Sequence, residues 1–269
     1  MMKQLLGQAI VAAVEAGKVI MTVYATDFSI QTKDDLSPLT QADTRAHDVI
    51  AHQLHITTLP IVSEEGRNIP YHKRENWQRY WLVDPLDGTR EFVNRNDEFT
   101  VNIALIDTNI PVMGVVYAPV ADLLYFSDDT GAWKLEKATT FEADFQDVDR
   151  LKAHARQLPS APKSADFIIV ASRSHLNEET TAFINAVKKE HGEISIVSKG
   201  SSLKLCMIAE GLADIYPRFG STSEWDTAAG HALIRAVGGR LVSAASQQEL
   251  TYNTESLKNP PFIAYRGAK

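Results

Sequence analysis

The chain has 269 residues, 44% of them apolar, and its 34 acidic and 27 basic side chains give a formal charge of −7 at neutral pH. A globular chain of this length buries roughly 75% of its unfolded surface, and the ordinary composition excludes a disordered chain or a small disulfide-stapled scaffold. The acidic balance argues against a binder of nucleic-acid polymers, whose phosphates are held by basic surfaces. A small anionic substrate would need local cations.

The single cysteine, Cys206, lies in an apolar run over residues 205–208. It has no partner for an intrachain disulfide, so we expect a buried helical thiol in a reducing compartment. We find no apolar run of about 18 residues, which a membrane-spanning helix needs, and no signal-peptide core at the start. We therefore expect a cytoplasmic protein without a transmembrane segment, and we leave open a peripheral attachment to the cytoplasmic side of the inner membrane.

The first half of the chain changes from a helical period to a strand period. Residues 5–24 carry apolar side chains at helical spacing and predict an amphipathic helix. A polar loop follows, and the capping-box spacing of Thr40 and Asp43 predicts a second helix. The apolar period then becomes two, which predicts an antiparallel meander with strands at 60–63, 80–83, 99–105, 112–117, 123–126 and 132–135.

The second half alternates strands with helices. Residues 137–165 are polar and end in two prolines, so they form the best candidate for a junction. After them we expect strands at 167–170, 194–197 and 213–216, and helices at 177–190, 202–210 and 226–237. We therefore predict an α+β protein with two subdomains, residues 1–136 and 137–269.

The densest chemical signal is the segment at residues 81–89, where an apolar strand leads Asp84 and Asp87 into a predicted turn. Gly88 allows close backbone approach, and the N–H groups of Gly88 and Thr89 would face an anion if a helix opens there. Carboxylate and carbonyl oxygens suit Mg²⁺. On spacing alone, a metal site has about the same weight as the simpler alternative, in which Asp87 and Gly88 form an ordinary turn and Asp84 only caps a loop.

Other acids stand at the ends of predicted elements. Glu64 follows a strand, Asp43 fits the third position of a helix, and Asp226 opens the helix at 226–237. Helix capping is the simpler explanation for Asp43 and Asp226. Spacing alone does not bring these segments together.

Three segments in this order resemble the signatures of lithium-sensitive, magnesium-dependent phosphomonoesterases related to inositol monophosphatase: residues 63–65 (SEE), 84–89 (DPLDGT) and 225–230 (WDTAAG). The stretches at 90–92, 200–204 and 216–220 resemble the bacterial 3′(2′),5′-bisphosphate nucleotidase branch. The resemblance runs nearly end to end. It implies a layered α/β/α/β/α sandwich of the inositol monophosphatase and fructose-1,6-bisphosphatase type, with an antiparallel N-terminal sheet and a mixed C-terminal sheet.

The resemblance also implies a role for individual residues. The metal ligands would be Glu64, Asp84, the Leu86 carbonyl, Asp87 and Asp226. Asp43 and Thr89 would position and deprotonate the attacking water, and the amides of Gly88 and Thr89 would hold the phosphate. The residues that match nucleotide-facing positions are His175, Ser201, Lys204 and Arg218. Residues 220–222 read Gly-Ser-Thr where Gly-Pro-Thr is more common, so the shape of this loop is open.

Electrostatics supports bound cations independently of the resemblance. Like charges about 4 Å apart repel by about 4 kcal/mol at an effective dielectric near 20, so four converging carboxylates would be costly alone. Two Mg²⁺ ions neutralise them, and a third would leave positive charge for a phosphate. We therefore expect two to three Mg²⁺ ions and a small anionic nucleotide as substrate.

The expected function is hydrolysis of the 3′-phosphate of adenosine 3′,5′-bisphosphate to AMP in sulfur assimilation, with the sulfated precursor as a further substrate. The alternatives are an inositol monophosphatase or broad-range sugar phosphatase, and a catalytically silent ligand-sensing protein on the same fold. A monomer and a homodimer are both open. We interpret His47, His52 and His55 as surface or hydrogen-bonded histidines rather than a zinc site, and Lys73 and Arg74 as solvated charges.

Overall fold

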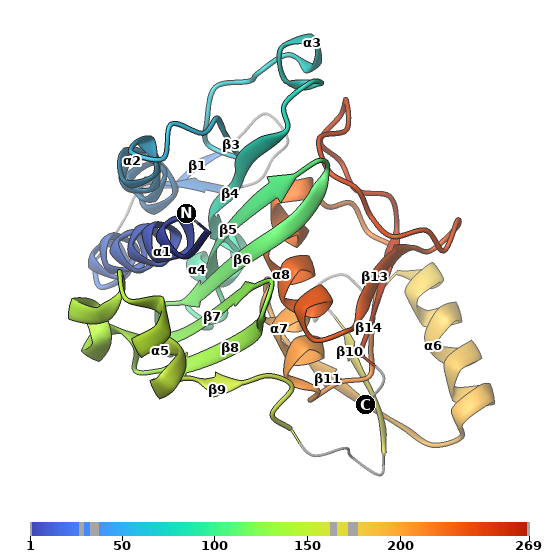
Figure 1. Cartoon of the computed structure of the whole chain (residues 1–269). Coiled ribbons are helices and arrows are strands. Elements are labelled where there is room, and N and C mark those ends of the chain that lie inside the picture. The colour runs from blue at the N-terminus through green and yellow to red at the C-terminus, as the bar shows by residue number, and fades with distance from the viewer. Residues whose placement is uncertain (1, 27–29, 33–37, 162–165, 172–176, 268–269) are drawn as a thin grey trace.

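Five layers of helices and sheets succeed one another in the computed structural model (Figure 1), which describes residues 2–26, 30–32, 38–161, 166–171 and 177–267. The outer helices α1 (Met2–Tyr24) and α2 (Gln41–His55) cover one face of a seven-stranded sheet. The helices α7 (Leu203–Glu210) and α8 (Glu224–Ala236) lie between this sheet and a five-stranded one. Helix α6 (Glu178–His191) covers the far face. The expected layered sandwich is confirmed.

Helix α1 forms because its apolar residues recur at helical spacing and meet the sheet. The helix is long enough to cross a membrane, and an 18-residue window of it has a mean hydropathy of 1.5. Of that window, 61% is buried inside the protein, as in the core helix of a folded domain. The expectation that no apolar run approaches this length is therefore wrong. Alanines occupy several sequence positions between the larger apolar residues and keep the mean hydropathy of the window high.

The seven-stranded sheet contains the predicted meander. Its strands, in spatial order, are β3 (Ile61–Ser63), β4 (Arg79–Asp87), β5 (Thr100–Asp107), β6 (Ile110–Ala118), β7 (Leu123–Asp128), β8 (Gly131–Glu136) and β9 (Arg156–Gln157). Strands β4 to β9 pair antiparallel, whereas β3 is parallel to β4. The parallel pair places the ends of β3 and β4 at the same edge of the sheet.

Strand β4 is buried on both faces, which explains its continuous apolar sequence. Trp81 and Val83 point into the core beneath α1 and α2. Tyr80 and Leu82 point into the core shared with α7 and α8. Successive side chains of a strand alternate between its faces, so a strand between two helical layers needs apolar residues at every position.

The five-stranded sheet is mixed, as the resemblance implies. Its order is β11 (Ile194–Ser198), β10 (Phe167–Ala171), β12 (Ile215–Arg218), β14 (Phe262–Tyr265) and β13 (Arg240–Ser243). Strand β10 is parallel to β11 and β12, and β14 is antiparallel to both of its neighbours. The sequence patterns predicted the first three of these strands and missed β13 and β14, which have four residues each.

Short elements connect these layers. They are β1 (Ile30–Thr32), β2 (Pro38–Thr40), α3 (Tyr71–Arg74), α4 (Thr89–Val93), η1 (Ala138–Asp144) and α5 (Val148–His154). The two sheets divide between β9 and β10, so part of the stretch beyond residue 136 still packs on the first sheet. The division into subdomains at residue 136 remains a prediction.

Two surface interpretations meet different outcomes. His47 is hydrogen-bonded as expected, with its Nδ1 2.9 Å from Ser63 Oγ. Arg74 is only 1% exposed, so its interpretation as a solvated charge is wrong. Its guanidinium donates to Asn253 Oδ1 at 2.8 Å and to the Glu255 carbonyl at 2.8 Å, groups about 180 residues away that local sequence does not reveal.

Candidate functional site

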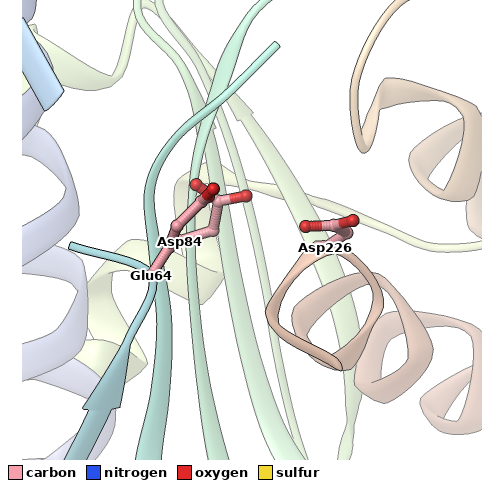
Figure 2. Close-up of side chains that lie close together, drawn as sticks. All are labelled: Glu64, Asp84 and Asp226. Carbon is pink, nitrogen blue, oxygen red and sulfur yellow. The ribbon is translucent and has the colours of Figure 1, made fainter. Parts of the chain in front are cut away.

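Three carboxylates from separate parts of the chain meet where the first sheet faces α8. One oxygen from each of Glu64, Asp84 and Asp226 lies within 4.8 Å of the others. Figure 2 shows Glu64 and Asp84 side by side and Asp226 reaching toward them from the helix. The first two are neighbours because β3 runs parallel to β4, with Ser63 opposite Val83. The sequence segments therefore converge as the resemblance implies.

Asp226 serves as a helix cap and also belongs to this cluster. It lies in the first turn of α8, where its Oδ2 accepts a hydrogen bond of 2.8 Å from the Ser223 amide. Helix α8 begins at Glu224 with Ser223 as its N-cap, so Asp226 does not open the helix as predicted but takes the third position of a capping box, which accounts for one oxygen of the carboxylate. A cap that holds Oδ2 also fixes the direction of the side chain toward Asp84.

The segment after Asp84 differs from the turn that we expected. Strand β4 continues to Asp87, and its register with β5 shifts between Asp84 and Asp87. Asp84 Oδ1 accepts a hydrogen bond of 3.1 Å from the Leu86 amide across this irregularity. The shift lets both carboxylates lie near the same site although they belong to one strand.

The cluster carries a strong electrostatic penalty in the absence of cations. Burial, followed by the charges of Glu64, Asp87, Asp226 and Asp43, holds the pKa of Asp84 well above its usual range. Burial, followed by Asp87 and Glu64, raises the pKa of Asp226 to about 8. A divalent cation would replace this repulsion by attraction. Carboxylate oxygens are the ligands that Mg²⁺ and related hard cations prefer, so these residues fit such an ion.

Asp87 lies beside the cluster. It is not among the three carboxylates that meet within 4.8 Å, but it acts on both Asp84 and Asp226 and lines a pocket next to Asp226. Its Oδ2 accepts a hydrogen bond of 2.8 Å from Ser202 Oγ. Its expected role as a ligand remains a prediction.

Gly88 makes the transition from β4 to α4. Its φ of 91° is left-handed, a region that glycine adopts without steric cost. A Cβ atom here would lie 3.2 Å from the Ser201 side chain and 3.3 Å from the Glu98 carbonyl. Helix α4 opens directly after it, as the anion-binding alternative required.

The two predicted catalytic residues lie at the starts of helices. Asp43 is 1% exposed in the first turn of α2, and its charge raises the pKa of Asp84. Thr89 is the first residue of α4, and its hydroxyl donates to the Leu86 carbonyl at 3.4 Å. Both residues therefore lie at the acidic site, and their roles in catalysis remain predictions.

A pocket adjoins the acidic site and brings basic groups to it. Its lining residues are Asp87, Glu91, Ser201, Ser202, Lys204, Leu205, Tyr216, Arg218, Thr222, Asp226, Thr227 and Phe262. Three of the four predicted nucleotide-facing residues are in this wall. The fourth, His175, lies outside the described residues.

The two cations of this pocket come from the second half of the chain. Lys204 is 6% exposed, and its Nζ donates to the Ser201 carbonyl at 2.7 Å. Burial lowers the pKa of Lys204 to about 8, partly opposed by Asp87. The buried Nε of Arg218 has no hydrogen-bond partner among the residues that the structure describes. A partner anion in the pocket would satisfy this donor.

Sequence reasoning missed two polar residues in the site. Ser202 appeared only as part of the segment at 200–204, and Asn102 appeared only as a strand residue. Asn102 Nδ2 donates to Ser202 Oγ at 2.8 Å, so the two connect β5 with the start of α7. A buried Asn in an otherwise apolar strand is a signal that could have marked the site.

Comparisons with known proteins agree with this geometry. Residues 1–264 match the inositol monophosphatase family. A 3′(2′),5′-bisphosphate nucleotidase CysQ from Salmonella typhimurium is 44% identical over 263 residues, 96% of this chain and 98% of the relative. One from Haemophilus influenzae is 32% identical over 265 residues, 97% of this chain and 92% of the relative.

Solved structures show the same relationship. CysQ from Bacteroides thetaiotaomicron, described as a bacterial member of the inositol monophosphatase family, has a TM-score of 0.88 and 45% identity, with 97% of each chain covered. The Thermotoga maritima IMPase, at 20% identity and a TM-score of 0.73 over 96% of this chain and 90% of that one, shares the fold. This chain therefore belongs to the inositol monophosphatase family.

Proposed function

We propose that this protein is a 3′(2′),5′-bisphosphate nucleotidase that hydrolyses the 3′-phosphate of adenosine 3′,5′-bisphosphate to give AMP and phosphate. Relatives with this printed name match the chain over nearly its full length. The observation that carries the proposal is the pocket in which Asp87 and Asp226 face the same space as Lys204 and Arg218. Acids that suit a cation thus stand beside cations that suit a second phosphate.

The residues present fit a divalent metal site, and we propose Mg²⁺ in two or three copies. Glu64, Asp84, Asp87, Asp226 and the Leu86 carbonyl would hold the ions. Bound Mg²⁺ supplies a Lewis acid for the phosphoryl oxygens and makes a bound water more acidic. Two ions balance the four carboxylate charges, and a third would favour an incoming dianion.

The protein groups would then orient the substrate and accept a proton. Asp43 would accept the proton of the attacking water, with the Thr89 hydroxyl as the relay between them. The amides of Gly88 and Thr89 would donate to the phosphate that is removed. This arrangement is supported by the burial of Asp43 and by the left-handed Gly88 that opens α4.

The nucleotide would extend into the adjoining pocket. Arg218 offers a buried N–H that no other described residue pairs with, and Lys204 and Ser201 lie in the same wall. The 5′-phosphate would receive hydrogen bonds from the two cations, and His175 would face the nucleotide. An inositol monophosphate has no second phosphate to use these charges, so the pocket favours the bisphosphate over this alternative.

A substrate panel tests the proposal. We expect Mg²⁺-dependent, lithium-sensitive phosphate release and a higher kcat/KM for adenosine 3′,5′-bisphosphate than for inositol 1-phosphate or fructose 1,6-bisphosphate. The sulfated precursor is included as a further substrate. Preference for the inositol ester would overturn the assignment, and no phosphate release with any ester at saturating Mg²⁺ would favour the silent ligand-sensing protein.

The cellular setting remains predicted from the sequence. A cytoplasmic location and a monomeric or homodimeric state are our expectations, and the described residues give no support to a peripheral membrane attachment. Sulfur assimilation is the setting in which adenosine 3′,5′-bisphosphate would be removed.

A further inference from the structure

Ser202 lies at the contact between the two halves of the site. It is 3% exposed and immediately precedes α7. Its Oγ is 2.8 Å from Asp87 Oδ2 and 2.9 Å from the Asp226 carbonyl oxygen, and it accepts the 2.8 Å hydrogen bond from Asn102 Nδ2. One hydroxyl therefore contacts groups from β4, β5 and α8.

The hydroxyl has one proton for two acceptors. A serine hydroxyl donates one hydrogen bond, and one of its two acceptor lone pairs receives the Asn102 amide. Asp226 belongs to helix α8, so its carbonyl oxygen is expected to accept the helical hydrogen bond from the amide four positions later. A hydrogen bond to a carboxylate is stronger than one to a neutral carbonyl, so the proton of Ser202 belongs on Asp87.

Asn102 holds Ser202 in this orientation. Its Oδ1 accepts a hydrogen bond of 3.0 Å from the Thr100 hydroxyl, which turns the Nδ2 group toward Ser202 and Asp87. Both Ser202 Oγ and Asn102 Nδ2 approach the same carboxylate oxygen, Asp87 Oδ2, at 2.8 Å and 3.4 Å. A cation would therefore meet Asp87 through Oδ1.

We propose that Ser202 is a positioning residue for the metal site. Its hydroxyl holds Asp87 by Oδ2, so that Oδ1 is presented to a divalent cation in one direction, and the same Oγ lies 2.9 Å from the Asp226 carbonyl oxygen in the first turn of α8. The inference rests on the proposed function in taking Asp87 as a metal ligand. It assigns no contact between Ser202 and the substrate.

Metal binding itself tests the inference. We would titrate the whole protein, after EDTA treatment and buffer exchange, with Mn²⁺ and follow free Mn²⁺ by electron paramagnetic resonance. We expect Ser202→Ala to weaken Mn²⁺ binding about tenfold, the lower end for partners that orient a metal ligand. Ser202→Thr keeps the hydroxyl and should restore most of the affinity. Ser198→Ala, at an exposed serine of the preceding strand, is the matched control.

Kinetics and stability separate positioning from folding. In Ser202→Ala the Mn²⁺ concentration for half-maximal activity should rise about tenfold while KM for the nucleotide at saturating Mn²⁺ stays near that of the wild type. The unfolding temperature in EDTA should fall only modestly, because the change removes one buried hydroxyl and leaves the backbone intact, and the circular dichroism spectrum should match that of the wild type.

Three results would overturn the inference. They are unchanged Mn²⁺ affinity in Ser202→Ala, an equal loss of affinity in Ser198→Ala, and a folded Ser202→Thr protein that binds Mn²⁺ as weakly as Ser202→Ala. If the wild type binds Mn²⁺ but hydrolyses none of the phosphate esters, the proposed function fails while the binding data still decide the role of Ser202.

Discussion

Asp87 illustrates how one carboxylate depends on its neighbours. It belongs to an irregular stretch of β4, accepts a hydrogen bond from Ser202, and raises the pKa of both Asp84 and Asp226. These interactions make Asp87 more sensitive to substitution than a surface acid. An amide in its place would keep the shape and one acceptor oxygen but lose the charge.

We predict that Asp87→Asn loses nearly all phosphatase activity, at least about 100-fold in kcat, since even partners of a metal ligand are worth about 10- to 100-fold. Its fold should persist because repulsion within the acidic site decreases. Asp129→Asn, at an exposed turn acid, is the control. Phosphate release and circular dichroism measure the two effects, and near-normal activity in Asp87→Asn would contradict the ligand assignment.

Lys204 makes the substrate preference depend on pH. Its pKa of about 8 in the free protein means that the ammonium group is present below that pH and is lost as the pH rises through it. We predict that kcat/KM for adenosine 3′,5′-bisphosphate falls above about pH 8 more steeply than kcat/KM for 3′-AMP, which lacks the second phosphate. Lys204→Met should remove this difference, and parallel profiles for the two substrates would count against the role of Lys204.

At the scale of elements, the packing of α8 on the first sheet determines where Asp226 lies. The two are in close contact at Gly114 of β6, where a Cβ atom would be 2.2 Å from the Ala229 carbonyl oxygen and 2.9 Å from the Ala232 Cβ. The helix backbone therefore rests against the strand backbone, with no room for a side chain. Any larger residue has to move α8, and Asp226 with it.

We predict that Gly114→Ala lowers the free energy of unfolding by about 1–3 kcal/mol, as overpacking of a core does, and reduces kcat as well. Gly192→Ala is the comparison, because Gly192 has a φ of 82° with no neighbouring atom within 4 Å. There we expect about 1–3 kcal/mol and no change in kcat, because a φ of 82° with a ψ of −131° is a backbone conformation that residues with a Cβ atom rarely adopt. Urea unfolding measures the loss of stability and steady-state kinetics measures kcat. An unchanged kcat in Gly114→Ala would show that the position of α8 does not affect catalysis.

At the scale of the whole molecule, the acidic site links stability to pH and to metal. The folded protein raises the pKa of Asp226 from 3.8 to about 8, and Asp84 shifts in the same direction. Between these two pH values the folded state binds more protons than the unfolded state. Without metal, the contribution of these groups to stability is therefore present at low pH and is lost as the pH rises toward about 8.

We predict that the unfolding temperature of the protein in EDTA is lower at pH 8 than at pH 6, and that excess Mg²⁺ raises it more at pH 8, because cations bind the ionised carboxylates. Calorimetry with and without Mg²⁺ measures the rise in unfolding temperature at each pH. In an Asp226→Asn protein, the rise at pH 8 should exceed the rise at pH 6 by less than it does in the wild type. Equal stabilisation by Mg²⁺ at both pH values would contradict the assignment of a metal to these acids.

Much of the fold could be predicted from local patterns, and the failures have identifiable causes. The period of apolar residues located α1, α2 and most of the meander. Pro85 and Gly88 suggested a turn, but sheet pairing carried β4 through Pro85 to Asp87. Strands β13 and β14 are too short for a clear period, and Arg74 is buried by distant partners.

The site shows a similar division. Resemblance identified Glu64, Asp84 and Asp226, whose convergence the structure shows, while spacing alone left each of the last two with a simple capping or loop explanation. Ser202 and Asn102 carried no motif of their own. Their importance arises from hydrogen bonds to each other and to Asp87, 15 residues or more away in the chain.

By itself the sequence determined most of the long helices and strands, because side-chain period and turn residues act over a few neighbouring positions. It also placed acids at the ends of β3 and β4. Only the tertiary structure decided that Asp226 comes within 4.8 Å of Glu64 and Asp84, after more than 140 intervening residues. The reason is that the position of α8 depends on the packing of two sheets around it, a property of the assembled core that no local pattern contains.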